Sequence, residues 1–377
     1  MIYYVTLDPE RALGLEDMLS SYTIICPYRS ELTEKLKRDG VNIVVLEDQV
    51  ATKELEKIVE RGTYGILQFV SDRKIIVKNN YVMVLKNSQL IEDFCKKQGW
   101  KLLAPTAKVA EKFENKISQY RLLKDVVPYP KACVSTLEKL ELHRHPFVLQ
   151  FNRGHSGNTT FFITSKKDLE KLTKKFPKRE AKISKYIKGK TYTLNCLVLK
   201  SGKVITGSVS EQITGLKSAT NNPNTTCGND FTSPRKLAVN QVKAIRKIAK
   251  NVGKAMYKRG YRGLFGIDAI IENRTASAYF IEVNTHQPAS ISFEAKLHRK
   301  IGKTPLMEYF ILDSLRAAGS RKPPPIILPI SARQIIYRNK TGKILSREYI
   351  AKIYKDKGLL SRMKFAKPNE EIYRIQR

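Results

Sequence analysis

Short apolar runs alternate with amphipathic segments along the first hundred residues. The apolar runs cover residues 1–7, 22–27 and 41–48, and the segments 11–21 and 31–40 between them have helical spacing. The series continues with apolar runs at 64–70, 74–80 and 81–87 and a helical segment at 88–98. This βαβ order is typical of an open, mainly parallel α/β sheet. No Gly-x-Gly-x-x-Gly follows the first strand, so we expect no dinucleotide site there.

The middle of the chain has longer helical and hairpin patterns. Residues 106–134 predict a helix capped by Thr106, a second helix that Lys116 opens, and an exit at Pro128 and Pro130. Residues 145–172 predict a strand, a glycine-containing turn, a strand and a helix, and residues 181–210 predict further strands. Residues 211–237 are so rich in Asn, Thr, Ser and Gly that we expect a long loop without regular structure. An amphipathic helix then covers 238–261.

Residues 262–297 hold the strongest candidate for a catalytic centre. GLFGIDAII and AYFIEVN are apolar strands joined by the turn residues NRTAS, so Asp268 lies opposite the Glu282 end of a hairpin. Two carboxylates and the Asn284 amide that converge among apolar residues would repel each other without a cation. Oxygen ligands of this kind indicate a magnesium site shared with a nucleotide. The ordinary alternative is a pair of strand-end carboxylates that face water.

The end of the chain is set apart by a proline run. KPPPIILP marks a boundary near residues 321–329, and the tail to Arg377 predicts a few strands and one helix packed back on the core.

Length and composition indicate a globular protein. The chain has 377 residues, 42% of them hydrophobic, which allows two or three lobes with an ample core. No apolar window approaches the roughly 20 residues that span a bilayer, and the first residues lack a signal-peptide pattern, so we expect a cytoplasmic protein without membrane contact. The five cysteines are scattered without a Cys-x-x-Cys pair, which indicates reduced, packing thiols rather than disulfides or zinc.

The net charge of +34 is the strongest signal in the composition. It would attract an acidic substrate or bind polyanions weakly and without specificity. The lysines are spread over nearly every helix without aromatic interleaving, so a bias of the lineage toward lysine explains the same number and no nucleic-acid module is indicated. The sequence does not indicate an oligomeric state.

Four segments resemble the ATP-grasp superfamily, in its carboxylate-amine ligase and biotin-carboxylase-like branch. Gly-x-x-Gly-x-Asp ending at Asp268 and Ile-Glu-x-Asn ending at Asn284 are similar to its metal-binding strands. The resemblance implies that Asp268, Glu282 and Asn284 hold two Mg²⁺ ions, or Mn²⁺ in their place. It also implies that Lys116 contacts the α and β phosphates of ATP.

The resemblance extends to a phosphate-covering loop and an adenine-binding strand. Backbone groups and hydroxyls around residues 154–160 would contact phosphate oxygens. The strand at residues 183–187 would bind the adenine edge. The implied nucleotide-binding residues of the two segments, in addition to Lys116, are Gln150, Gly154, Ser156, Gly157, Thr159, Ser184, Lys185, Tyr186, Ile187 and Thr191.

The sequence departs from the family pattern in three places. The family usually has a second lysine where this chain has Gln150, which leaves open either weaker nucleotide binding or a replacement charge from Arg153 or Lys217. Two glutamates that hold the base and ribose in many relatives are replaced by Ser184 and Thr191, which leaves another purine nucleotide open. In many relatives Asn284 is followed by Pro-Arg, and the Arg binds a carboxylate. This chain has instead Thr285, His286 and Gln287, followed by Pro288 and Ser290. His286 is a general base or a hydrogen-bonding residue.

The implied architecture is an α/β fold with three parts. We expect an N-terminal α/β lobe at 1–104, a two-lobed ATP-grasp domain at 105–320 and a small C-terminal extension at 321–377. The loop at 211–237 is expected to cover the acceptor substrate, and Glu211, Gln212, Lys217, Asn229 and Asp230 are its candidate contacts, with a surface role as the alternative.

The implied reaction is phosphoryl transfer from ATP to the carboxylate of a small molecule or peptide. An amine, or less often a thiol, then attacks the acyl phosphate to give the ligated product, ADP and phosphate. The alternatives are a carboxylating or kinase-like ATP-grasp enzyme, and a basic nucleotide-dependent nucleic-acid-binding protein without ligase chemistry.

Overall fold

The N-terminal lobe is a five-stranded parallel sheet with helices around it. The computed structural model describes all residues except 17–19, 141–145, 153–159, 320 and 355–364. The strand order is β3-β2-β1-β4-β5, and each neighbouring pair is parallel. This confirms the open parallel sheet. Its strands are β1 (Ile2–Val5), β2 (Tyr22–Cys26), β3 (Asn42–Val45), β4 (Tyr81–Val84) and β5 (Lys101–Leu102), and its helices are α1 (Glu31–Arg38), α2 (Thr52–Glu60), α3 (Gly62–Asp72) and α4 (Gln89–Gln98).

Three expectations for this lobe were wrong. The apolar run at residues 74–80, expected as a strand, forms turns and bends between α3 and β4. The apolar run at residues 64–70, expected as a strand, lies inside α3. A short apolar run fits a buried strand or a buried helix equally well, and here one face of the helix packs into the core through Ile66 and Val70. The helix expected at 11–21 does not form at residues 13–16 and 20–21, which are turns and bends, and residues 17–19 lie outside the described part. The short 3₁₀ turn η1 (Pro9–Ala12) lies at its start, and Asp8 caps this turn by accepting a hydrogen bond from the Glu10 amide.

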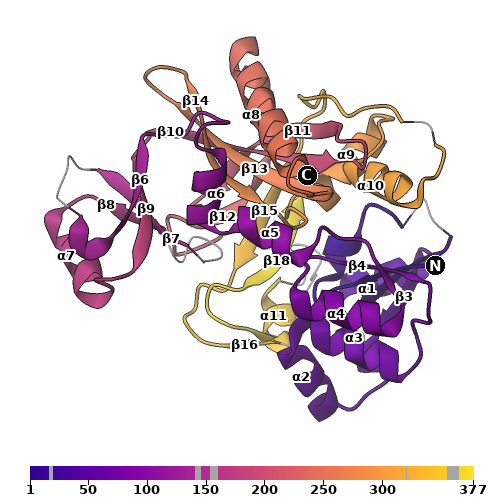
Figure 1. Ribbon diagram of the computed structural model, residues 1–377. Coiled ribbons are helices and arrows are strands. Elements are labelled where there is room, and N and C mark those ends of the chain that lie inside the picture. Colours follow the sequence, from indigo (N-terminus) through magenta and orange to yellow (C-terminus); the bar gives the residue numbers. More distant parts are fainter. Residues whose placement is uncertain (17–19, 141–145, 153–159, 320, 355–364) are drawn as a thin grey trace.

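A small antiparallel sheet stands beside the rest of the molecule (Figure 1). Its order is β6-β9-β7-β8, and its members are β6 (Ala132–Thr136), β7 (Phe147–Phe151), β8 (Thr160–Ile163) and β9 (Glu180–Lys185), with α7 (Lys166–Lys175). The preceding helices are α5 (Ala107–Glu114) and α6 (Lys116–Leu123). Thr106 is the N-cap residue of α5, but its side chain makes no cap hydrogen bond; the Glu92 carboxylate accepts from the Ala107 amide instead.

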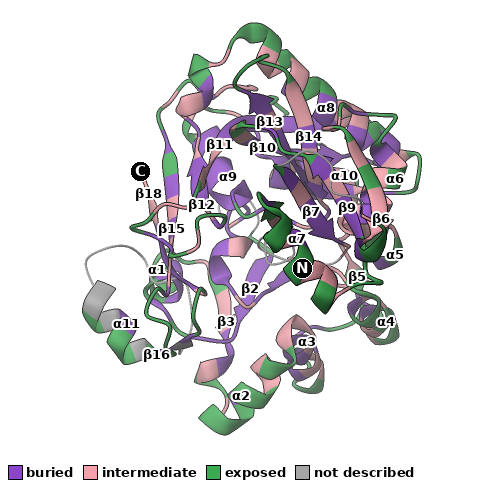
Figure 2. Cartoon of the chain, turned by 90° about the vertical axis from the view of Figure 1, so that its left-hand side faces the viewer, coloured by how far each residue is buried: buried purple, intermediate pink, exposed green. Residues whose placement is uncertain are grey.

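The large sheet has seven strands in the order β14-β13-β10-β11-β12-β15-β18. Figure 2 shows that the central strands β10 and β13 are buried over most of their length. The strands are β10 (Gly189–Val198), β11 (Val204–Thr214), β12 (Thr226–Asp230), β13 (Gly263–Glu272), β14 (Ala278–Asn284), β15 (Arg333–Arg338) and β18 (Glu371–Gln376). The expected hairpin is confirmed as β13 and β14, with Asp268 paired to Glu282.

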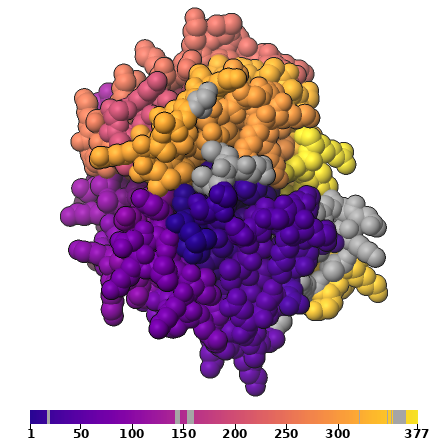
Figure 3. All heavy atoms as spheres, turned by 90° about the vertical axis from the view of Figure 1, so that its right-hand side faces the viewer, coloured from indigo at the N-terminus to yellow at the C-terminus, as the bar shows by residue number. Residues whose placement is uncertain are grey.

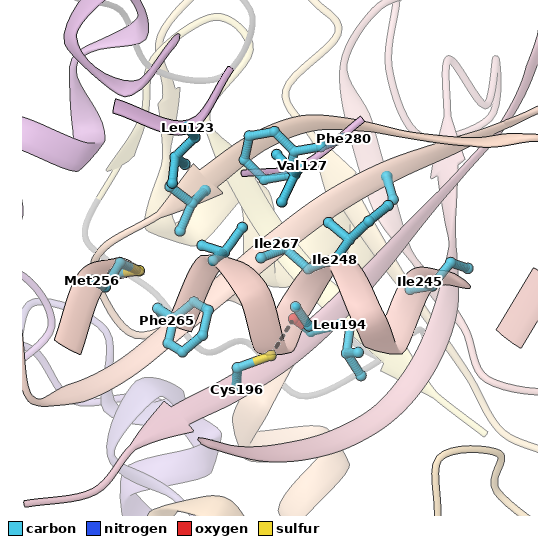
Figure 4. Packing of buried hydrophobic residues seen from close by; sticks show 14 of the residues in the cluster. Leu123, Val127, Leu194, Cys196, Ile245, Ile248, Met256, Phe265, Ile267 and Phe280 are labelled. Atoms are coloured by element: carbon cyan, nitrogen blue, oxygen red, sulfur yellow. Dashed lines mark hydrogen bonds between the residues drawn. The ribbon is translucent and has the colours of Figure 1, made fainter. Parts of the chain in front are cut away.

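Helices cover both faces of the large sheet. On one face, α8 (Val239–Tyr257) contributes Ile245, Ile248 and Met256 to a core that also contains Leu194 and Phe265 from the strands (Figure 4). On the other face lie α9 (Ile291–Lys300) and α10 (Leu306–Leu315). A second core cluster joins α10 to strands of both the large sheet and the N-terminal sheet, and Figure 3 shows the two parts in contact over a wide face.

The expected long loop at 211–237 was partly wrong. Residues 211–214 finish β11, and residues 226–230 form β12, so the irregular stretch between the strands covers only 215–225. These strand residues are polar because they face other polar groups: Asn229 is 5% exposed and donates to the Ser210 hydroxyl. A polar strand of this kind lacks the apolar alternation by which a strand is recognised.

The C-terminal residues return to the core, as expected. β15 and β18 extend the large sheet beyond β12, while β16 (Leu345–Ser346), β17 (Phe365–Ala366) and α11 (Arg347–Tyr354) lie beside it. The division of the chain at 104 and 320 stays a prediction. No helix among the described residues is both long and apolar enough to cross a membrane. The cysteines Cys26, Cys95, Cys133, Cys196 and Cys227 are free, and all but Cys133 are buried.

Gly228 allows β15 to pair with β12. Its φ is +134°, and a Cβ built on it would lie 1.9 Å from the Gln334 carbonyl oxygen. We expect Gly228→Ala to lower the free energy of unfolding by about 2 to 3 kcal/mol, because strained backbone and a clash coincide. Gly40→Ala is the matched control, since its φ is +77° with open space around it, and we expect a cost of about 1 kcal/mol. Equal denaturation midpoints for the two variants would contradict this account of the β12–β15 contact.

Candidate active site

Two adjoining cavities lie between the small sheet and the large sheet. The larger has a volume of about 810 Å³ and contacts strands β7 to β11, and the smaller has a volume of about 400 Å³ and ends at the β13–β14 hairpin. They share the side chains of Gln150, Thr160, Phe162, Thr191 and Gln212. A ligand can therefore extend from the first into the second.

A pair of carboxylates lies at the inner end of the smaller cavity. Asp268 and Glu282 are opposite each other on β13 and β14, and Asp268 is only 8% exposed. The Thr193 hydroxyl donates to Asp268 Oδ1 at 2.7 Å, and the Gln212 amide donates to that hydroxyl at 2.8 Å. Burial, followed by the charge of Glu282, raises the pKa of Asp268 to about 7. The site is therefore short of positive charge at Asp268.

Lys116 supplies the positive charge nearest the pair. It is the first residue of α6, and Asn152 holds that end of the helix: its carbonyl accepts from the Lys116 amide at 3.0 Å and its side chain from the Ile117 amide at 3.1 Å. The Lys116 ammonium donates to Glu282 Oε2. Burial alone would raise the pKa of Glu282, but this contact holds it below its ordinary value, and the same carboxylate keeps the pKa of Lys116 raised against burial.

The donors at this end suit a hard cation. Asp268, Glu282 and Asn284 all line the smaller cavity and offer only oxygen ligands from their carboxylates and amide carbonyl. The described residues contain no group of three or more His, Cys, Asp or Glu side chains that could hold a metal, so a soft-metal site is not assembled there. A divalent cation would compensate the burial and the repulsion from Glu282 that together raise the pKa of Asp268, and these residues therefore fit Mg²⁺.

A second polar cluster borders the carboxylate pair. Glu114 ends α5 and lies 3.3 Å from His286 Nδ1 and 3.1 Å from Lys86 Nζ, and it accepts from the Thr285 amide at 3.0 Å. Burial would raise the pKa of Glu114, but the close His286 ring and the charge of Lys86 hold it well below its ordinary value. His286 thus has a carboxylate partner and also lines the smaller cavity.

The larger cavity has the apolar walls that a flat ring system requires. Val148, Ile187, Ile270 and Phe280 contribute apolar surface, and Tyr129 lies at the same wall. Of the residues expected to hold a nucleotide, Ser184, Lys185, Tyr186, Ile187 and Thr191 all line this cavity.

Other predicted residues are not part of these cavities. Lys217 is exposed and lies outside both linings. The segment with Arg153, Gly154, Ser156, Gly157 and Thr159 lies outside the described residues. Among the candidate contacts of the 211–237 segment, Gln212 lines both cavities and Glu211 and Asp230 line the larger, whereas Asn229 is buried against Ser210.

The sequence interpretation missed four side chains that the fold brings to the site. Thr193 orients Asp268, Glu114 pairs with His286, Arg338 from β15 lines the smaller cavity, and Lys182 from β9 lines the larger one. The sequence signal for Lys182 was that it lies between the apolar residues Ala181 and Ile183 of β9. Arg338 had no such signal, since it lies far away in the sequence.

Residues 113–289 match the family model described as ATP-grasp domain. No curated protein matches the chain by sequence. Among solved structures, N5-carboxyaminoimidazole ribonucleotide synthetase from Thermotoga maritima has a TM-score of 0.60 at 16% identity, and the match covers 100% of this chain and 92% of that one.

Two further structures have the same fold. N5-carboxyaminoimidazole synthase from Aspergillus clavatus, in complex with ADP and 5-aminoimidazole ribonucleotide, has a TM-score of 0.66 at 12% identity and the match covers 100% of this chain and 92% of that chain. Biotin carboxylase from Campylobacter jejuni has a TM-score of 0.64 at 16% identity, with coverage of 92% of this chain and 77% of that chain. At these identities the likeness shows the fold, and it confirms the expected fold class.

Proposed function

Residues 113–289 form an ATP-grasp domain, and on that premise we propose that the protein is an ATP-dependent ligase. It activates a substrate carboxylate as an acyl phosphate and joins it to an amine or a thiol, releasing ADP and phosphate. The observation that carries the proposal is the pair of buried Asp268 and half-buried Glu282 beside Lys116, in the lining of a cavity that adjoins an apolar one. Two carboxylates that converge in a partly buried place are unfavourable unless a cation compensates their charge, and such a cation can hold a polyanion.

The residues have separate roles in this mechanism. The apolar cavity holds the base and ribose, and the phosphates extend toward Lys116. Asp268, Glu282 and Asn284 would hold Mg²⁺, which neutralises charge on the transferred phosphoryl group when it is bound. Thr193 and Gln212 fix the direction of the Asp268 carboxylate through their hydrogen bonds. Because these dipoles are already oriented, the site needs little reorganisation during transfer.

The reaction has two balanced steps. A carboxylate oxygen of the substrate attacks the terminal phosphorus of ATP, an O–P bond forms, and the bond to the leaving ADP breaks. The nitrogen of the acceptor then attacks the acyl carbon, phosphate leaves, and the amine loses a proton. The His286 imidazole is a base for this proton, since it lines the cavity and its Nδ1 lies 3.3 Å from the Glu114 carboxylate, which orients the ring.

The acceptor is placed in a third cavity. It has a volume of about 410 Å³, is lined by Lys86, Ser88, Lys108 and Thr285, and shares Glu114 with the smaller cavity of the active site. Its walls come from the N-terminal lobe and from α5, so both parts of the chain select the acceptor. The lysines suit an acceptor with an anionic group.

Bicarbonate is the second candidate for the activated acid. It is itself a carboxylate and would pass through the same mixed anhydride with phosphate. The observation that favours it is the smaller cavity, which Arg338 lines together with the carboxylate pair, so that a small acid bound there has a cation available. The reported structures are named for carboxylated products or for carboxylation.

A hydroxylamine trap tests the proposal. With ATP, Mg²⁺ and an acid that stimulates ADP formation, hydroxylamine is expected to yield a hydroxamate even without the natural acceptor, because any small nitrogen nucleophile held near the acyl phosphate attacks it. The measurement is the ferric hydroxamate colour together with ADP release, with bicarbonate and organic acids in separate reactions. Omission of the acid is the control.

The outcome separates the alternatives. A kinase that makes a stable phosphate ester forms ADP without hydroxamate, and a binding protein forms neither. We would abandon the ligase function if an acid that clearly stimulated ADP formation gave no hydroxamate at any hydroxylamine concentration and no acyl product with any amine or thiol.

A further inference from the structure

One lysine of the site is buried without an anionic partner. Lys182 lies on β9, is 2% exposed, and lines the 810 Å³ cavity. Within the part of the chain that the structure describes, its ammonium makes no hydrogen bond or ion pair, and its nitrogen lies 5.4 Å from the centre of the Tyr129 ring. Removing an ammonium from water without a counter-ion is unfavourable, so this position is suited to an anion that arrives with a ligand.

Lys182 is placed where the two cavities of the active site meet. It is the cross-strand partner of Gln150, which lines both cavities. Side chains of directly opposite residues in antiparallel strands lie on the same face, with Cβ atoms about 5 Å apart. Gln150 makes a hydrogen bond to Thr160 at 3.2 Å and carries no charge. The cation at this point of the sheet is therefore Lys182.

The electrostatics of the site show which groups act on this ammonium. Burial, followed by repulsion from the charge of Lys116, lowers the pKa of Lys182 to about 8, and Glu282 opposes the shift. Two lysines thus act on the same space from α6 and β9, and one of them has no carboxylate of its own. A phosphate chain between them would compensate both charges.

We propose that Lys182 binds phosphate oxygens of the nucleotide as the second cation beside Lys116, and that it replaces, from the neighbouring strand, the lysine that related chains have at position 150. The inference rests on the proposed function in one respect, since it takes the ligand to be a nucleoside triphosphate. Because positions 150 and 182 face each other, moving the cation from one to the other keeps it on the same wall of the site. Neither Arg153 nor Lys217 is then needed for this charge.

Binding measurements on four variants test the assignment. Titration calorimetry with ATP and with ADP, both with Mg²⁺, is applied to the wild type, Lys182→Met, Lys182→Gln and the exchange variant Gln150→Lys/Lys182→Gln. Lys131→Met, which removes an exposed lysine near the same sheet, is the control. Adenosine, which has no phosphate, is followed by the shift in melting temperature at millimolar concentration.

We expect both single changes at Lys182 to weaken ATP binding about 10- to 100-fold, the size of a lost charge-assisted hydrogen bond. The melting-temperature shift caused by adenosine is expected to stay the same in all variants. The exchange variant is expected to regain at least half of the lost ATP affinity on a logarithmic scale. The Lys131→Met control is expected to bind ATP as the wild type does. Without ligand, Lys182→Met is expected to melt no lower than the wild type, because a buried unpaired charge has been removed.

Three results would overturn the inference: unchanged ATP affinity in Lys182→Met, an equal loss for ATP and adenosine, or an exchange variant as weak as Lys182→Gln alone. Failure of the proposed function looks different. In that case the wild type itself binds neither ATP nor GTP, and no variant shows nucleotide binding either.

Discussion

Asp268→Asn and Glu282→Gln are each expected to lower magnesium-dependent ATP turnover about 10²- to 10³-fold, the loss that follows removal of one group that stabilises transition-state charge. Each change keeps the shape of the side chain and removes one negative charge from the proposed metal site. Glu282→Gln also takes the anionic partner from Lys116. The measurement is phosphate release at saturating ATP over a range of Mg²⁺ concentrations.

Folding must be checked beside turnover. Asp268 has a pKa raised to about 7 by burial and by Glu282, so an uncharged amide at this position relieves repulsion and the melting temperature should not fall by much. Glu180→Gln is the matched control, because Glu180 begins β9 at the surface and its partner among the described residues is the exposed Arg121. Full turnover in both purified site variants at saturating Mg²⁺ would remove the proposed metal site.

Arg374→Met is expected to lower the free energy of unfolding by about 3 to 5 kcal/mol, the cost of leaving buried carboxylates without their cation. Arg374 on β18 is buried and lies 3.0 Å from Asp8 and 2.9 Å from Glu10 of the N-terminal lobe, and it also contacts Glu371. One guanidinium thus joins the last strand of the chain to the first loop of the N-terminal sheet. Denaturation by urea, followed by circular dichroism, measures the loss.

The deficit should also depend on pH, and its sign follows from burial. Burial already raises the pKa of Glu10 against the opposing charge of Arg374, so removing that charge raises it further. A carboxyl group with a raised pKa in the folded state contributes stability below its unfolded pKa that is lost as pH rises. The difference between wild type and variant should therefore be larger at pH 8 than at pH 5.

Arg121→Met provides the comparison for this stability effect. Arg121 pairs with Glu180 at 3.3 Å, but both side chains are more than half exposed, so we expect a change within about 1 kcal/mol. A deficit for Arg374→Met no larger than that of Arg121→Met, or one that does not grow with pH, would show that this buried cluster does not hold the C-terminal strand to the N-terminal lobe.

The sequence by itself determined those elements that depend only on the residues within one segment. The apolar strands around Asp268 and Glu282, with turn residues between them, fix a hairpin and its register, because alternation decides which side chains share a face. The helix that Lys116 opens, the long amphipathic helix α8 and the parallel N-terminal sheet follow from periodicity in the same way.

The tertiary structure alone decided which distant residues share the site. The apolar run at 64–70 becomes a helix because one face of it packs into the N-terminal core, and polar residues at 226–230 become a strand because β11 and β15 pair with both of its edges. Thr193 donates a hydrogen bond to Asp268 because their strands β10 and β13 are paired. The charge of Lys116 acts on Lys182 only because the fold packs α6 against β9. Pairing between strands and burial of a charge depend on partners far along the chain, and no local pattern of hydrophobic and polar positions encodes which partner that will be.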